Sequence, residues 1–256
     1  MVGPSSAVIL LGSAALLLVA AGCGKSTEPP AQQAPAAPPA AAAPSADVAK
    51  HMADHFSKVR EVEEAIIRGD VEAARAPALW IADHQETTGL PAGTETYVAE
   101  MKVAARSVAS TSDVSIAAAA AASLVASCGG CHAAAKVTPR LPEAVAPAPG
   151  TSRVRHMRAH QHAVDLMYRG LVAPSDEYWN KGAAGLKAAP LGAKELPAAA
   201  TGSAASEARV HELAERATAA TDRSARVAIY GVVIGSCANC HGKHGMVWGP
   251  GLPKTQ

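Results

Sequence analysis

The chain has 256 residues, a formal net charge of +1 and 18% charged residues. This balance lacks the strong single-sign field on which nucleic-acid binding depends, so no nucleic-acid partner is expected. Aromatic residues make up only 3% of the chain, which leaves a conventional core short of large side chains, and the length allows one or two ordinary domains.

Residues 1–23 are typical of an export signal. An apolar run approaches Cys23 through small residues, and the string Val19-Ala20-Ala21-Gly22-Cys23 is similar to a bacterial lipobox. No Lys or Arg occurs in these residues and position −3 is Ala20 rather than Leu, so a cleaved signal without a lipid stays open. Both interpretations put the mature protein on the periplasmic side of the cell envelope, and a lipid on Cys23 would anchor it to a membrane.

Residues 24–46 are predicted to be an extended linker, because prolines punctuate an Ala-rich tract that has no hydrophobic period. From Asp47 the pattern becomes helical, and apolar residues recur at a near-3.6 period up to Gly69, which is predicted to end the helix. Further helices are predicted over about 70–85 and 94–109. A fourth begins at the capping pair Ser112-Asp113. Residues 47–137 are therefore expected to form one four-helix bundle.

Residues 138–150 are predicted to be a second linker, after which the pattern repeats. Helices are expected from about 151 past Gly170, over 175–188 and 206–220, and from Thr221 or Asp222 onward. No alternating β pattern appears. The sequence thus predicts an all-α fold of two tandem four-helix bundles, with the second over 151–245 and a tail over 246–256.

Each predicted bundle ends its last helix with Cys-Xaa-Xaa-Cys-His, once as Cys128, Cys131 and His132 and once as Cys237, Cys240 and His241. This pentapeptide is the attachment signature of c-type haem. Positions i, i+3 and i+4 share one helix face. Two thiols can therefore form thioethers with a porphyrin while the imidazole reaches its iron. Two molecules of haem c are expected, with Cys128, Cys131, Cys237 and Cys240 as covalent attachment points and His132 and His241 as proximal ligands.

Two other uses of these cysteines are less favoured. A zinc site would have to unite two distant Cys-Xaa-Xaa-Cys knuckles and would leave both following histidines unexplained. A thioredoxin-like thiol pair would need a βαβ context, which the pattern lacks.

The sixth iron ligands are open. Both first helices carry His-Met-Xaa-Xaa-His, and Met52 and Met157 are the first candidates, with His55, His160 and His156 as alternatives. One register between the halves pairs Met52 with Met157, and another pairs His55 with His156. Methionine would give a raised reduction potential, histidine a lower one, and a vacant position would admit a small gas. The other histidines, His84, His162, His211 and His244, are predicted to lie at the surface.

The chain resembles the class II cytochromes c, the cytochrome c-prime family, over residues 47–136 and 151–245. The resemblance rests on the two pentapeptides at the ends of last helices and on Met52-Ala53-Asp54-His55-Phe56 in the first helix. It implies four-helix bundles with one covalently attached haem each, and in much of that family the haem iron is five-coordinate.

These features predict a dihaem electron-transfer protein that exchanges electrons with redox proteins of the cell envelope. A five-coordinate haem that binds or senses nitric oxide or carbon monoxide is the alternative. No further cluster of acids and bases stands out, so the chain is not expected to be an enzyme such as a dihaem peroxidase.

Overall fold

The computed structural model describes residues 45–84, 89–147, 152–187 and 203–244. Within these ranges it contains eight α-helices and no strand, which confirms the prediction of an all-α fold. In chain order the helices are α1 (Ala46–Ile67), α2 (Val71–Asp83), α3 (Glu95–Ser110), α4 (Val114–Ala134), α5 (Ser152–Val172), α6 (Asp176–Leu186), α7 (Ser203–Ala219) and α8 (Arg223–His244).

Several predicted segments lie outside the described residues. They are the signal peptide over 1–23 with Cys23, the linker as far as residue 44, residues 148–150 of the second linker, and the tail over 246–256. The predictions made for these segments therefore stay predictions.

Side-chain oxygens begin several of the helices at the predicted residues. Asp113 accepts the backbone N–H groups of Ser115 and Ile116 at 2.8 and 2.9 Å, and Ser175 accepts that of Tyr178 at 3.3 Å. These bonds satisfy donors that the first turn of a helix leaves without an intrahelical partner. Local chemistry thus sets the start of α4 and α6.

Gly69 ends α1 as predicted. Its φ is +78°, its N–H donates to the carbonyl of Ile66, and the N–H of Asp70 donates to the carbonyl of Ala65. This pair of bonds is a Schellman motif, in which glycine takes the left-handed conformation at little cost. Gly170 instead lies inside α5, so the two Arg-Gly pairs of the sequence are not structurally equivalent.

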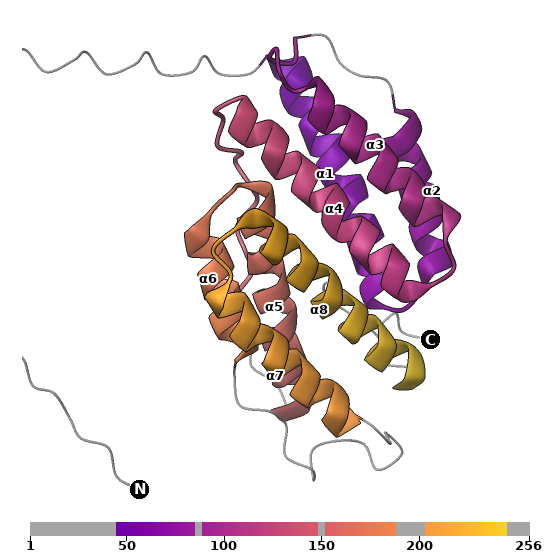
Figure 1. The fold of residues 1–256 in the computed structure, drawn as a ribbon, viewed down its shortest axis with the longest axis vertical. Coiled ribbons are helices and arrows are strands. Elements are labelled where there is room, and N and C mark those ends of the chain that lie inside the picture. The colour runs from indigo at the N-terminus through magenta and orange to yellow at the C-terminus, as the bar shows by residue number, and fades with distance from the viewer. Residues whose placement is uncertain (1–44, 85–88, 148–151, 188–202, 245–256) are drawn as a thin grey trace, which may run out of the picture. The chain divides into compact units, whose positions relative to one another are not determined.

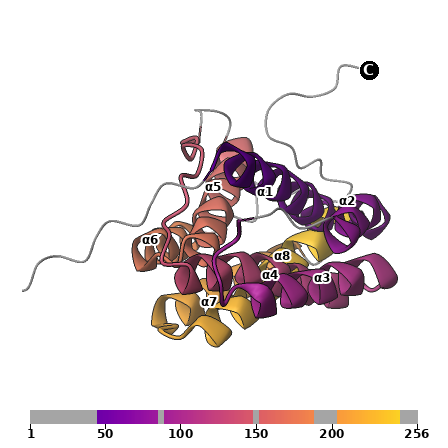
Figure 2. The ribbon, with the colours of Figure 1, turned by 90° about the horizontal axis from the view of Figure 1, so that it is seen from above.

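The helices form two groups of four, which we call the first quartet (α1–α4) and the second quartet (α5–α8). In each quartet every helix contacts the next, and the first helix also contacts the fourth. The quartets meet chiefly where α4 packs on α8, with further contacts of α8 to α1 and of α4 to α5 (Figures 1 and 2). A single cluster of buried apolar residues includes side chains from both quartets.

Small residues bring α4 and α8 close together. A Cβ on Gly231 would lie 3.2 Å from Cα of Ala119, and a Cβ on Gly235 would lie 3.3 Å from Cβ of Ala118.

Among the described helices, α4 alone is long and apolar enough to cross a membrane. Its apolar residues are accounted for by packing, because α4 contacts α1, α3, α5 and α8.

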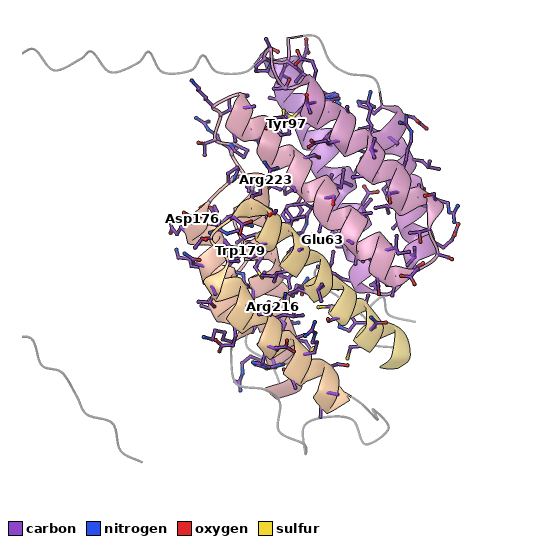
Figure 3. The ribbon with its side chains drawn as sticks, viewed as in Figure 1. Glu63, Tyr97, Asp176, Trp179, Arg216 and Arg223 are labelled. Carbon is purple, nitrogen blue, oxygen red and sulfur yellow. The ribbon has the colours of Figure 1, made fainter. Side chains whose placement is uncertain are left out.

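A buried polar network around Glu63, the residue of it that Figure 3 labels, joins the quartets. Glu63 of α1, only 1% exposed, accepts the hydroxyl of Tyr230 of α8 and pairs with Arg60 at 2.6 Å. Arg60 also reaches Asp165 of α5 at 3.2 Å. Burial raises the pKa of the Glu63 carboxyl. A buried carboxylate is costly unless its oxygens have partners, so these bonds tie α1, α5 and α8 together.

Replacing Tyr230 by Phe removes one of the hydrogen-bond donors to Glu63 and leaves a carboxyl oxygen of Glu63 buried without that donor. We expect Tyr230→Phe to lower the free energy of unfolding by about 1 to 3 kcal/mol, the cost of a buried polar group that has lost its partner. Urea denaturation measures this change. Tyr178→Phe is the control, because Tyr178 is 37% exposed. An equal loss of unfolding free energy in both variants would contradict a stabilising role for the hydrogen bond between Tyr230 and Glu63.

Candidate functional site

Both pentapeptides lie on helices, as predicted. Cys128, Cys131 and His132 are on the last turns of α4, and their counterparts are on the last turns of α8. All four cysteines are half-buried and none is in a disulfide. Two thiols and one imidazole therefore share a face of each helix, at the spacing i, i+3 and i+4.

The two pentapeptide histidines make the same hydrogen bond. Nδ1 of His132 lies 2.8 Å from the carbonyl oxygen of Val172, and Nδ1 of His241 lies 2.8 Å from that of Ile67. A carbonyl oxygen only accepts, so Nδ1 must carry the proton in both rings. Burial lowers the pKa of both imidazoles, which keeps them neutral at pH 7. The lone pair of each ring is therefore on Nε2, the atom left to ligate a metal.

The accepting carbonyls come from helix ends in the opposite quartet. Ile67 is the last residue of α1 and Val172 is the last residue of α5. Carbonyls in the last turn of a helix have no intrahelical donor, so they are available to a side chain. The imidazole of α4 in the first quartet is thus oriented by α5 of the second, and the imidazole of α8 is oriented by α1 of the first.

The residues present fit a c-type haem. The donor set in each pentapeptide is two thiols that are not in disulfides and one neutral imidazole with a fixed tautomer. This set suits two thioether bonds and one bond to iron.

The same residues fit a thiol redox pair or a zinc knuckle poorly. Burial raises the pKa of the Cys128 and Cys237 thiols to about 12, whereas redox thiols act as thiolates. Among the described residues, no group that brings three metal-ligating atoms together contains a cysteine.

The two pentapeptides lie at opposite ends of the α4–α8 contact. Gly231 and Gly235 of α8 face Ala119 and Ala118 of α4, while Arg223 at the start of α8 is beside Gly130 near the end of α4. The two helices are therefore antiparallel (Figure 1). At 1.5 Å per residue, this register separates the pentapeptides by roughly 20 to 30 Å along the helix axes.

The glycines of the first pentapeptide allow close contacts with three other helices. A Cβ on Gly130 would lie 2.4 Å from the ring of Tyr97 in α3 and 2.8 Å from the guanidinium of Arg223 in α8. A Cβ on Gly129 would lie 1.9 Å from the carbonyl oxygen of Leu171 in α5. Tyr97 and Arg223 come from different quartets and both approach this end of α4 (Figure 3).

Three histidines gather at the same end of the first quartet. His51 and His55 of α1 meet His84 at the end of α2, and their ligand nitrogens all lie within 4.8 Å of one another. The Trp80 ring stacks on that of His84, with 3.9 Å between centroids. Burial lowers the pKa of His55 to about 4, so this imidazole is neutral at pH 7.

The second quartet holds a related group. His156 and His160 of α5 meet Glu207 of α7, with Nε2 of His156 2.5 Å and Nε2 of His160 3.7 Å from the same carboxylate oxygen. Burial lowers the pKa of His160 to about 4 as well. We refer to His51, His55 and His84 as the first histidine group, and to His156, His160 and Glu207 as the second.

The structure decides the register between the halves. The carbonyls of Ile67 and Val172, which accept the pentapeptide imidazoles, give a common reference point. His55 and His160 each lie twelve residues before that reference, so they are equivalent, and Met52 is equivalent to Met157 in the same alignment. His156 therefore corresponds to His51 rather than to His55. Both methionines are half-buried in their helices, and whether either ligates iron stays a prediction.

The prediction that His84, His162 and His211 lie at the surface is wrong. All three are half-buried, and His84 belongs to the first histidine group. Glu207 was not predicted as a site residue at all. Trp80 and His84 are spaced i, i+4, as are the paired histidines in α1 and in α5, and this spacing puts two side chains on one helix face. The spacing is the sequence signal that could have identified His84 as a member of the first histidine group. The side chain of His244 is not described.

Comparison with protein-family models, with curated proteins and with solved structures gives no match to this chain.

Gly129→Ala tests the close contact between α4 and α5. The added Cβ would collide with the carbonyl of Leu171, so we expect the free energy of unfolding to fall by about 1 to 3 kcal/mol as the helices separate. Thermal or urea denaturation measures the loss. Gly242→Ala is the matched control, because a Cβ there meets nothing within 4 Å. Equal stability in the two variants would show that the close approach is not needed.

Proposed function

We propose that this chain is a dihaem c-type cytochrome that transfers electrons in the bacterial cell envelope, and that it is not an enzyme. The observation that carries the proposal is the same hydrogen bond at the two pentapeptide histidines. In both, Nδ1 donates to a helix-end carbonyl at 2.8 Å, and the neutral ring keeps its lone pair on Nε2.

Each residue of the site then has a distinct role. Cys128 and Cys131, and likewise Cys237 and Cys240, would hold a haem covalently. His132 and His241 would be proximal ligands through Nε2, and the helix-end carbonyls would hold each ring in place. When bound, each haem would supply an iron that gains and loses one electron. The rest of the chain would orient the ligands and keep water away from them.

We also propose that each quartet is one haem-binding four-helix bundle of the class II cytochrome type. The closed chain of contacts from the first to the fourth helix in each quartet supports this interpretation. Because the pentapeptides lie at opposite ends of the α4–α8 contact, one haem would face an electron donor while the other faced an acceptor. Both partners would be redox proteins of the envelope.

The proposed sixth ligands are Met52 and Met157. They are equivalent in the register that the structure gives, and each lies on the first helix of its quartet. The start of α1 and the end of α4 lie at one end of the first quartet. His84 at the end of α2 meets His51 and His55 of α1 at this end.

A lipid on Cys23 and the Pro/Ala segment after it would tether the cytochrome to a membrane from the periplasmic side. The mature protein would then reach membrane-bound partners without leaving the envelope.

Replacing the cysteines in pairs tests haem attachment. We expect the mature chain purified from its own host, once the lipid on Cys23 is accounted for, to exceed its polypeptide mass by two haems. Cys128→Ala/Cys131→Ala and Cys237→Ala/Cys240→Ala should each lose one haem, because both thioethers of a single site are removed. Intact-mass spectrometry and the visible spectrum report the number. Cys23→Ala is the control, since it should keep both haems and lose only the membrane attachment. A colourless wild-type chain of polypeptide mass would end the proposal.

Carbon monoxide tests the sixth ligands. In a carrier whose irons are six-coordinate through Met52 and Met157, the spectrum of the reduced protein should not change immediately when carbon monoxide is added. Met52→Ala and Met157→Ala should each open one iron, so that about one equivalent of gas binds at once to each variant. Stoichiometric binding to the wild-type chain would favour a gas-binding or gas-sensing protein instead.

A further inference from the structure

The two histidine groups contain more ligating atoms than an iron of haem needs on its distal side. The first brings together three imidazoles, and the second brings together two imidazoles and a carboxylate. In each group two of the ligands are spaced i, i+4 on one helix, and the third comes from another helix of the same quartet. Each quartet therefore brings together a set of three donors, although the third donor differs.

A second observation points to a missing partner. Nε2 of His55 and Nε2 of His160 are buried and make no hydrogen bond, and each residue is only 7% exposed. A buried polar atom without a partner costs free energy and is uncommon in a folded protein. Here it occurs at equivalent positions in the two quartets, and in both cases the atom belongs to a group of converging ligands.

We propose that each histidine group binds one divalent transition-metal ion in addition to the haems. His51, His55 and His84 would supply three nitrogens to one ion, and His156, His160 and Glu207 would supply two nitrogens and one oxygen to the other. The Nε2 atoms of His55 and His160, which make no hydrogen bond, then become ligands.

The donor sets indicate the class of metal. Three protein ligands of the types His₃ and His₂Glu, with a fourth position open, are typical of zinc sites that keep a water or substrate position. Imidazole also suits copper and nickel, whereas calcium and magnesium prefer oxygen donors. Ligand atoms around one zinc ion at about 2.0 to 2.1 Å lie roughly 3 to 4 Å apart. Small side-chain rotations would bring each group to that separation from its present limit of 4.8 Å.

The histidine groups do not include the attachment residues of the pentapeptides. His132 and His241 are turned toward Val172 and Ile67, and neither belongs to a histidine group. His55 and His160 each lie twelve residues before one of these carbonyls. The first group lies at the end of the first quartet that carries the first pentapeptide. At 1.5 Å per residue it is about 18 Å along α1 from the carbonyl that accepts His241 of the second pentapeptide, and the second group is about 18 Å along α5 from the carbonyl that accepts His132 of the first.

The test uses the full haem-containing chain after chelation of loosely bound metal, with Zn²⁺ as the probe. Calorimetric titration and elemental analysis should give two zinc ions per chain. X-ray absorption at the zinc edge, which haem iron does not obscure, should show nitrogen or oxygen neighbours at about 2.0 to 2.1 Å.

His84→Asn and Glu207→Gln should each lose one zinc ion, and the double variant should lose both. His162→Asn is the matched control. The Nδ1 atom of His162 is also buried without a partner, but the residue belongs to neither group, so both ions should remain.

Failure of this inference is distinguishable from failure of the haem proposal, because zinc and haem are counted separately in each variant. No zinc uptake at micromolar concentration would overturn the inference, as would equal uptake by wild type, His84→Asn and Glu207→Gln. An electron paramagnetic resonance signal of bis-imidazole haem that disappears in His55→Gln would also overturn it. That imidazole would then be an iron ligand and not available to a second metal.

Discussion

The close packing of α4 on α8 is the constraint on which the rest of the structure depends. Gly231 and Gly235 present no side chain to the alanines of α4, so the two backbones approach within the range of direct contact. The low aromatic content of the chain is consistent with this solution, because small side chains pack tightly where the helices are close. Both helices end in a pentapeptide. Their antiparallel contact therefore puts the two candidate sites at opposite ends of one shared core.

That shared core also explains why each pentapeptide imidazole is oriented from the other quartet. The end of α1 and the end of α5 lie beside α8 and α4 because the quartets interlock. Carbonyls without intrahelical donors are then in reach of an Nδ1–H group. In the proposed cytochrome, the orientation of each proximal ligand would depend on the packing of both quartets. A change that loosened the contact between them would disturb both sites together.

Some buried polar groups of the interior have hydrogen-bond partners and others have none. Glu63 is buried, and its oxygens meet Tyr230 and Arg60. The buried Nε2 atoms of His55 and His160 and the buried Nδ1 atom of His162 make no hydrogen bond. The Nε2 atoms of His55 and His160 differ from Nδ1 of His162 because each belongs to a group of converging ligands, so a bound metal ion would satisfy them. The symmetry of the pair strengthens this explanation, because an accident of packing would not be expected twice at equivalent positions.

The sequence by itself determined the helices, their ends and the pentapeptides. Caps such as Asp113 and Ser175, the Gly69 terminus and the spacing of the cysteines all act within about four residues, a range over which sequence neighbours are also neighbours in space. Only the tertiary structure decided which carbonyl meets each imidazole, which register relates the halves, and that His84 and Glu207 join the paired histidines. Those partners are far apart in the chain. Their meeting depends on how whole helices pack, which no local pattern specifies.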